Sequence, residues 1–287
     1  MKEYVIDDTD FDLELTMTCG QTFCWHRVAG TLYEDGKPHF YTFRNEKPIV
    51  VEQTDKGVIA RTELSRKEVE KALGLDRDLN KIFEAFPEDE VLEEARDELW
   101  GLRIVQDEFF PCLISYLCSP QMRIPRIKKM HNAIAEEYGE VKTVDGIEMR
   151  RFPTLDEMAE ASEQDLRDIG VGYRAKYIVE SVKILKEQDF DPEKIRGRDY
   201  EDAREALKTL YGVGDKVADC VLLFSLGFHE AYPIDTWASQ ALEKHYPSLY
   251  SEDYEELSRN VRRYFGEDAG YAQEYIFHAA RNGVLET

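Results

Sequence analysis

With 287 residues the chain holds enough material for one large domain or two, and no stretch approaches the roughly eighteen consecutive apolar residues of a membrane-spanning helix. Five scattered cysteines exclude a regular disulfide framework, and the first residues lack a signal-peptide pattern, so we expect an intracellular protein. The formal net charge of −22 excludes a surface that is basic all over.

The acidic residues are spread along the chain rather than gathered in a tail, so we expect a surface adapted to concentrated salt and a halophilic source. At about 1 M salt the Debye length is roughly 3 Å, and acidic residues away from a binding face then barely repel an anionic partner. A local basic island matters more than the total charge under these conditions. One lies at 123–129, where four residues are positive and none is negative. The alternative is that this island is an ordinary solvated helix face.

The N-terminal third has the pattern of an antiparallel sheet. Aromatic or alternating runs are separated by turn signals, among them Asp35-Gly36 and 55–57. A capping box of Ser65 and Glu68 then predicts the first of several short helices. The predicted strands span 11–15, 23–28, 39–44, 49–52 and 58–61.

From Trp100 onward nearly every segment has helical periodicity. We therefore predict an α+β fold, with an antiparallel sheet domain and short helices at 1–98 and an all-helical domain at 99–287. Helix starts in the second part are predicted at Pro111, Pro125, the capping box of Thr154 and Glu157, and Ser162.

The candidate chemistry lies between 205 and 243. A helix ends near Leu210, a glycine turn follows at 212–214, and Lys216 lies in the first turn of an apolar helix. Glycines let the backbone approach a ligand closely, and the amides at a helix start form a seat for phosphate. The helix dipole there disfavours an ammonium and so favours the neutral amine that a nucleophile needs. The alternative is a lysine that only contacts phosphate.

Asp235 follows an apolar run and precedes another helix. A carboxylate at this point is either only an N-cap or a charge that also acts on a substrate. The glycine turn is repeated at 170–172, which indicates a second turn facing the same ligand or merely two unrelated helix ends.

Several motifs resemble those of one family. The run LYGVGDKVADC at 210–220, followed by Pro233-Ile234-Asp235, resembles the helix-hairpin-helix, Gly/Pro-Asp superfamily of base-excision DNA glycosylases. CGQTFCW at 19–25, GYRAK at 172–176 and GYAQ at 270–273 are similar to the 8-oxoguanine DNA glycosylase branch. The resemblance covers nearly the whole chain and implies that its second part is a helix-hairpin-helix glycosylase domain.

The resemblance implies a role for individual residues. Lys216 corresponds to the lysine that attacks C1′ of the sugar, and Asp235 to the aspartate that stabilises the positive charge developing there. The residues implied to contact the flipped base are Gly20, through its carbonyl, with Cys220, Gln273 and Phe277. The backbone implied to hold the DNA phosphate belongs to Gly212, Val213 and Gly214.

The chain departs from the animal members at the segment that fills the space of the flipped base. Its 119–123 segment lacks their asparagines, and Trp237 stands where they have a histidine. Both departures predict less strict discrimination of the opposite base than in the animal members. The candidates for wedge and opposite-base contacts are Gln121, Met122, Arg126, Tyr173 and Arg174.

The expected function is excision of 8-oxoguanine through a lysine Schiff base, followed by cleavage of the abasic site. We expect no redox cofactor and no catalytic metal. The resemblance implies a structural monovalent cation on backbone carbonyls of Lys208, Leu210 and Val213. The expected partner is double-stranded DNA containing oxidised guanine, bound by a monomer in a prokaryotic cytoplasm.

Two alternatives stay open. One is excision of a different damaged or mispaired base, although such relatives usually carry four clustered C-terminal cysteines for an iron–sulfur cluster and no cysteine follows Cys220 here. The other is a non-catalytic DNA-binding protein that uses the hairpin for phosphate contacts alone. Borohydride trapping of a covalent protein–DNA adduct distinguishes this non-catalytic protein from a glycosylase for 8-oxoguanine and from a glycosylase for another base.

Overall fold

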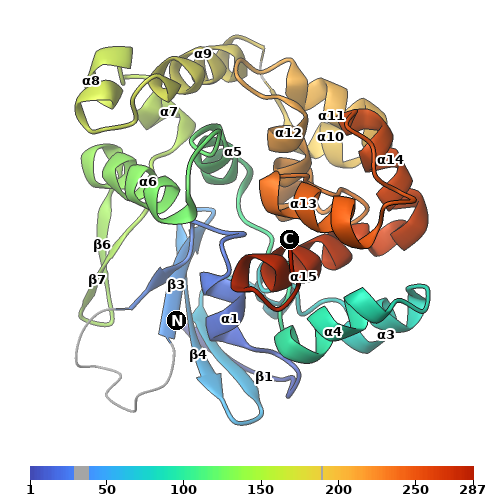
Figure 1. The fold of residues 1–287 in the computed structure, drawn as a ribbon. Helices are drawn as coiled ribbons and strands as arrows, with labels where there is room; N and C mark the ends of the chain where they lie inside the picture. Colours follow the sequence, from blue (N-terminus) through green and yellow to red (C-terminus); the bar gives the residue numbers. More distant parts are fainter. Residues whose placement is uncertain (29–38, 189) are drawn as a thin grey trace.

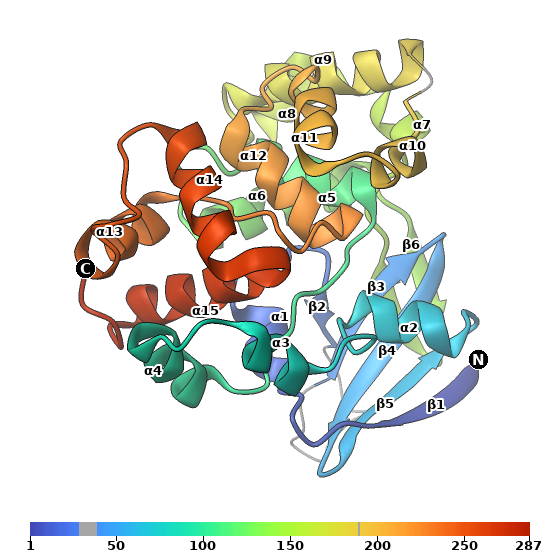
Figure 2. The same ribbon diagram turned by 90° about the vertical axis from the view of Figure 1, so that its right-hand side faces the viewer.

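An antiparallel sheet lies beside a larger group of helices in the computed structural model, which describes residues 1–28, 39–188 and 190–287 (Figures 1 and 2). The strand order is β1-β5-β4-β3-β2, and central pairs such as Val51 with Ala60 fix the register. The strands are β1 (Lys2–Asp7), β2 (His26–Arg27), β3 (His39–Arg44), β4 (Lys47–Thr54) and β5 (Gly57–Thr62).

The two faces of the sheet pack against different elements, because side chains alternate along a strand. From β4, Ile49 and Val51 join a core with α1 (Leu13–Thr18) and α2 (Arg66–Ala72). Val50 points to the opposite face, where it contacts Ile147 and Met149. These last two residues belong to a second, two-stranded sheet of β6 (Val141–Val144) and β7 (Ile147–Arg150).

The remaining elements are helical. The predicted capping boxes of Ser65 with Glu68 and Thr154 with Glu157 are both present. The helices are α3 (Leu79–Ala85), α4 (Glu90–Leu99), α5 (Phe109–Leu117), α6 (Ile124–Tyr138), α7 (Leu155–Met158), α8 (Glu163–Asp168), α9 (Arg174–Glu187), α10 (Pro192–Arg196), α11 (Tyr200–Lys208), α12 (Asp215–Val221), α13 (Thr236–His245), α14 (Tyr254–Phe265) and α15 (Ala269–Asn282), with a π-helical turn at Leu222–Leu226 and a 3₁₀ turn at Gly266–Asp268. None of the helices in the described part of the chain is long and apolar enough to cross a membrane.

The predicted α+β fold is confirmed, and the strands predicted at 39–44, 49–52 and 58–61 are confirmed with it. The strand predicted at 11–15 is wrong: the Asp12 side chain accepts a hydrogen bond from the Leu15 amide and begins α1 instead. Only 26–27 of the predicted strand 23–28 is extended in the sheet, and β1, β6 and β7 were not predicted. The turn expected at Asp35-Gly36 lies outside the described residues.

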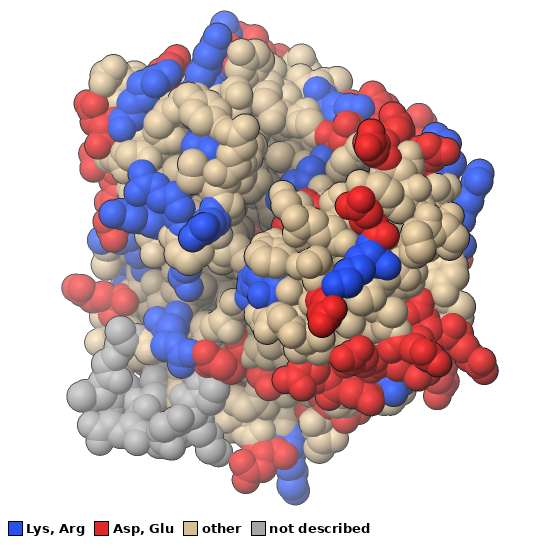
Figure 3. Space-filling model, in the orientation of Figure 1, with Lys and Arg blue, Asp and Glu red and all other residues tan. Residues whose placement is uncertain are grey.

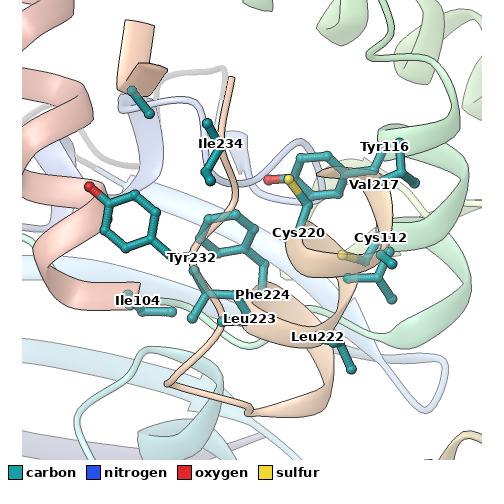
Figure 4. Close-up of a cluster of buried hydrophobic side chains, with 14 of the residues drawn as sticks. Ile104, Cys112, Tyr116, Val217, Cys220, Leu222, Leu223, Phe224, Tyr232 and Ile234 are labelled. Carbon is teal, nitrogen blue, oxygen red and sulfur yellow. The ribbon is translucent and has the colours of Figure 1, made fainter. Parts of the chain in front are cut away.

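The largest core surrounds α12 and the π-helical turn that continues it. Figure 4 shows Leu223 and Phe224 of this turn close to Tyr232 and Ile234 of the following segment. The same core includes apolar residues of α4, which packs against α15. The predicted division at 98/99 therefore falls within the last turn of α4 and divides it from the helices that share its core, and it stays a prediction.

Candidate active site

One large cleft of about 1650 Å³ lies among the helices. Its walls come from the end of α5 and the start of α6, from α12, from the start of α13 and from α15. The cleft brings together predicted site residues that are up to 257 positions apart in the sequence, which no local pattern places side by side. The predicted site residues that line it are Gly20, Gln121, Met122, Gly212, Gly214, Lys216, Cys220, Asp235, Gln273 and Phe277.

The glycine hairpin at 212–214 forms one edge of this cleft. Gly212 has φ +85°, and a Cβ placed on it would lie 2.5 Å from Cγ of Tyr177, so only glycine fits there. The Val213 amide donates to the Leu210 carbonyl at 3.2 Å, which tightens the turn. Gly214 is the N-cap of α12 and has open space around it, as a close approach to a phosphate requires.

Lys216 reaches from α12 toward α5. Its Nζ lies 3.4 Å from Oγ of Ser119 and 5.2 Å from the centre of the Tyr116 ring. Cys220 lies one helical turn further on, and Figure 4 shows its sulfur beside Tyr116. Burial raises the pKa of the Cys220 thiol to about 12, although the positive charge of Lys216 opposes this shift. Cys220 is thus a neutral wall of the cleft rather than a nucleophile.

Asp235 begins α13, and its Oδ1 accepts a hydrogen bond from the Ala238 amide at 2.9 Å. The predicted capping role is confirmed. The residue also lines the cleft, so that its carboxylate faces the same space as Lys216. Trp237, two residues later, is 40% exposed at the cleft wall.

A buried network fixes the two elements that carry Lys216 and Asp235. Asp219 of α12 is fully buried, pairs with Arg204 of α11 at 3.1 Å and accepts from the Tyr254 hydroxyl at 2.7 Å. The same hydroxyl accepts from the Ile234 amide, next to Asp235. Burial raises the pKa of Asp219 to about 6, while Arg204 opposes the rise. Asp219 of α12 is therefore linked through the Tyr254 hydroxyl to the backbone of Ile234, the residue before Asp235.

The inner end of the cleft is formed by α15 and the chain just after α1. Gly20 has φ +110°, a conformation that favours glycine. Gln273 is 4% exposed and its Oε1 has no hydrogen-bond partner among the described residues, so this acceptor is free for a ligand. Phe277 lies one turn later, and the Arg281 guanidinium lies 5.5 Å from the centre of its ring. The spacing of Gln273, Phe277 and Arg281 places them on one face of α15.

Glu274 is a part of the site that the sequence reading missed. It is 3% exposed, lines the cleft and lies 3.7 Å from the Cys19 sulfur. Burial raises its pKa to about 7, the Arg281 charge opposes the shift, and smaller effects come from Asp235 and Lys216. Glu274 thus lies within electrostatic reach of both catalytic candidates. The signal in the sequence was a charged residue within an otherwise apolar stretch of helix.

The residues predicted to act on the opposite base divide into two groups. Gln121 and Met122 lie at the cleft, where Gln121 has φ 58° and Met122 is 36% exposed. Arg126, Tyr173 and Arg174 are not among the cleft-lining residues in the described part of the chain.

The two arginines of the second group make backbone contacts. Arg126 donates to the Gly170 carbonyl at 3.2 Å and is otherwise exposed. Arg174 is buried, donates to the Pro120 carbonyl, and stacks 4.3 Å from the centre of the exposed Tyr173 ring. Arg174 thus holds the 119–123 segment through the Pro120 carbonyl, without lining the cleft itself.

Charge is distributed unevenly over the face that contains the cleft. In Figure 3 lysines and arginines gather over the part where α6 lies in Figure 1, and acidic residues form a band below, over α3 and α4. Within the basic island at 123–129, Arg123, Arg126 and Lys129 are exposed. The basic side therefore borders the 119–123 segment at the cleft.

Two family models match the chain in succession. Residues 3–113 match the N-terminal domain of 8-oxoguanine DNA glycosylase, and residues 114–267 match the HhH-GPD superfamily of base excision DNA repair proteins. The chain belongs to the HhH-GPD superfamily. The family resemblance inferred from the motifs is confirmed.

Relatives in this superfamily match over almost the full chain. A probable N-glycosylase/DNA lyase of Methanothermobacter thermautotrophicus is 34% identical, over 96% of each chain. The N-glycosylase/DNA lyase OGG1 of Arabidopsis thaliana is 33% identical, over 94% of this chain and 78% of its own. The structure of Clostridium acetobutylicum 8-oxoguanine glycosylase/lyase with DNA containing cytosine opposite 8-oxoguanine is similar, with a TM-score of 0.84, 30% identity, and coverage of 96% of this chain and 94% of that one.

Proposed function

We propose that this protein is a bifunctional DNA glycosylase and AP lyase that removes 8-oxoguanine from double-stranded DNA. The observation that carries the proposal is that Lys216 and Asp235 line one cleft whose inner end presents Gly20, Gln273 and Phe277. The superfamily to which the chain belongs acts in base excision repair, and the similar proteins named above are glycosylase/lyases.

The damaged base is flipped out of the DNA duplex into the inner end of the cleft. Phe277 supplies a stacking surface, the Gly20 carbonyl accepts from N7–H of the oxidised base, and the free Oε1 of Gln273 accepts from its Watson–Crick edge. Extruding the base costs a few kcal/mol, and the segment with Gln121 and Met122 offsets part of this cost by filling the space left behind.

The reaction then proceeds at C1′ of the sugar. Lys216 reacts as the neutral amine: its nitrogen forms a bond to C1′ as the glycosidic bond breaks, the base leaves with the bonding electrons, and the proton released by the new ammonium centre passes to the base. The carboxylate of Asp235 stabilises the positive charge on the sugar. Opening of the sugar ring gives the protonated Schiff base, and loss of a C2′ proton expels the 3′ phosphate by β-elimination. The hairpin of Gly212, Val213 and Gly214 holds a DNA phosphate meanwhile, with the amides of Gly212 and Gly214 facing the cleft and the Val213 amide closing the turn on Leu210.

Borohydride trapping and a lesion panel test this function together. We expect a covalent adduct with duplex DNA that carries 8-oxoguanine, and slower excision of oxidised pyrimidines and mispaired adenine. Excision of another base at a higher rate identifies the other glycosylase class, and DNA binding without any trapped adduct identifies a non-catalytic binding protein.

Discrimination of the opposite base is expected to be weaker than in the animal enzymes. A good bidentate contact contributes roughly 1–3 kcal/mol, or about tenfold to a hundredfold in preference. We propose that Arg126 contacts the orphaned cytosine and that Arg174, with Tyr173, positions the segment carrying Gln121. Arg126→Ala and Arg174→Ala should each lower the preference for cytosine by about tenfold. The measurement is single-turnover excision with each of the four bases opposite 8-oxoguanine.

Arg167→Ala is the matched control for that experiment. Arg167 lies on α8 and pairs with Glu163 at 2.6 Å on an exposed surface, so its loss should leave the preference unchanged. A preference for cytosine as strict as that of the animal enzymes, unchanged in the Arg126 and Arg174 variants, contradicts this account of the opposite-base contacts.

As salt is diluted, the protein is expected to lose folding stability before it loses affinity for DNA. The dispersed charge of −22 repels itself most strongly at low ionic strength, where the Debye length is long. We therefore propose a halophilic protein whose melting temperature rises by about 5 °C or more between dilute buffer and about 2 M KCl. A melting temperature that stays constant or falls as KCl is added argues against salt adaptation. The control titration uses sucrose, which adds no charge.

We propose a structural monovalent cation on backbone carbonyls of Lys208, Leu210 and Val213. The Lys208 carbonyl ends α11, so it lies beyond the helical hydrogen-bond pattern, and the Leu210 carbonyl would bind the cation with the lone pair that the Val213 amide does not use. We further propose a monomer that works on the nucleoid in a prokaryotic cytoplasm, with its sheet domain at 1–98 and its glycosylase domain at 99–287.

A further inference from the structure

Three metal-ligating side chains meet next to the base pocket without a role in the mechanism above. Cys19 follows the last turn of α1, and Glu274 and His278 lie one turn apart on α15. Their ligand atoms all lie within 4.8 Å of one another, and all three residues are buried. We propose that Cys19, Glu274 and His278 form a binding site for one divalent ion of the zinc class. The site is independent of the proposed glycosylase chemistry.

The separations are close to those of a tetrahedral zinc site. Zinc–ligand bonds of about 2.0–2.3 Å place neighbouring ligand atoms about 3.5 Å apart. The Cys19 sulfur and Oε2 of Glu274 are already 3.7 Å apart. The widest separation has to close by at most about 1.3 Å, which rotation of the side chains can supply.

The histidine provides the independent observation that points to a ligand. His278 is 1% exposed, and neither of its ring nitrogens has a hydrogen-bond partner among the described residues. Buried polar groups are normally satisfied, and a neutral imidazole has one N–H and one lone pair to satisfy. The Cys19 backbone lies near enough to interact with the ring, and the remaining lone pair beside a thiol and a carboxyl is available to a metal ion. Burial lowers the pKa of His278 to about 3, so its ring is neutral and able to coordinate a metal.

The ligand set selects the class of ion. One thiolate, one imidazole and one carboxylate suit zinc and cobalt, whereas magnesium and calcium prefer oxygen alone. Three protein ligands leave the fourth position for water, and Glu274 lines the cleft, which provides a path of entry. The ion would join the end of α1 to α15 at the inner end of the base pocket.

Charged side chains around the site act on a bound cation with both signs: two nearby positive residues repel it and one negative residue attracts it. The Arg281 guanidinium donates to the Cys19 carbonyl at 2.6 Å and is the principal cation facing the site, with Lys216 acting on Glu274 from α12. Asp235 acts on Glu274 with the opposite sign.

Cobalt(II) titration of the full chain, after removal of metals with a chelator, tests the site directly. We expect one Co²⁺ per chain, with a sulfur-to-cobalt charge-transfer band and the visible bands of tetrahedral coordination, all removed by Zn²⁺. Cys19→Ser should abolish the charge-transfer band, and Glu274→Gln and His278→Gln should weaken binding by about tenfold to a hundredfold or more. Arg281→Met should tighten it by roughly tenfold.

Cys118→Ser is the matched control, because Cys118 is another buried thiol and lies outside the three-residue site. It should keep the band. Circular dichroism and melting curves establish that each variant is folded. Arg281→Met keeps Cys19, Glu274 and His278, so its change in cobalt affinity tests the site without removing a ligand. Cobalt bound without a thiolate band, a band that survives in Cys19→Ser, or equal loss in Cys118→Ser each overturns the proposal.

Discussion

Lys216→Gln is expected to lose excision and borohydride trapping altogether, by at least about a thousandfold in single-turnover rate. A glutamine amide cannot form the covalent bond to C1′, so the reaction loses its nucleophile. The side chain lies at the cleft, 3.4 Å from Ser119, and its replacement opens no cavity in the core. The melting temperature and the affinity for 8-oxoguanine duplexes should therefore stay close to wild type.

Lys208→Gln is the matched control for the loss of a positive charge near the hairpin. Lys208 lies at the end of α11 and pairs with Asp215 at 2.8 Å, but it does not line the cleft. We expect its variant to keep trapping and nearly all of the excision rate. Residual excision by Lys216→Gln within tenfold of wild type would falsify the covalent mechanism.

Motifs that act through the backbone were readable from the sequence. The hairpin glycines, the N-cap at Asp235 and the two capping boxes each depend on a few adjacent residues, and each lies where it was predicted. The β6–β7 hairpin had such a signal too, in Asp145-Gly146, whose φ angles of 51° and 82° match the turn that this dipeptide favours. The segments on either side have strong helical periodicity, and the short hairpin between them was therefore not predicted.

Features that depend on distant contacts were not readable. Arg174 matches a family motif, yet the structure buries it against Pro120, 54 residues away, so its position follows from packing rather than spacing. Glu274 stands in an otherwise apolar stretch of helix, but that pattern does not say which residues its carboxyl contacts. Only the fold reveals that its carboxyl is buried beside Cys19, 255 residues away.

The strand predicted at 11–15 failed for a local reason. The run alternates in polarity as a strand does, but Asp12 satisfies a backbone amide at the start of a helix, and three of the six residues of α1 then turn toward the core. A short apolar pattern is compatible with both structures, and the cap decides between them.

Asp235→Asn is expected to separate the two roles of this residue. Asparagine caps a helix about as well as aspartate, so α13 should start at the same point and the melting temperature should change little. The negative charge that stabilises the sugar is lost, however, and excision should slow by about a hundredfold or more.

Asp253→Asn is the matched control, because Asp253 caps α14 through the Glu256 amide at 2.8 Å and does not line the cleft. The measurement is single-turnover excision of 8-oxoguanine by both variants, with melting curves alongside. If Asp235→Asn excises as fast as Asp253→Asn, the carboxylate of Asp235 only caps its helix, and the charge that assists departure of the base must come from another group.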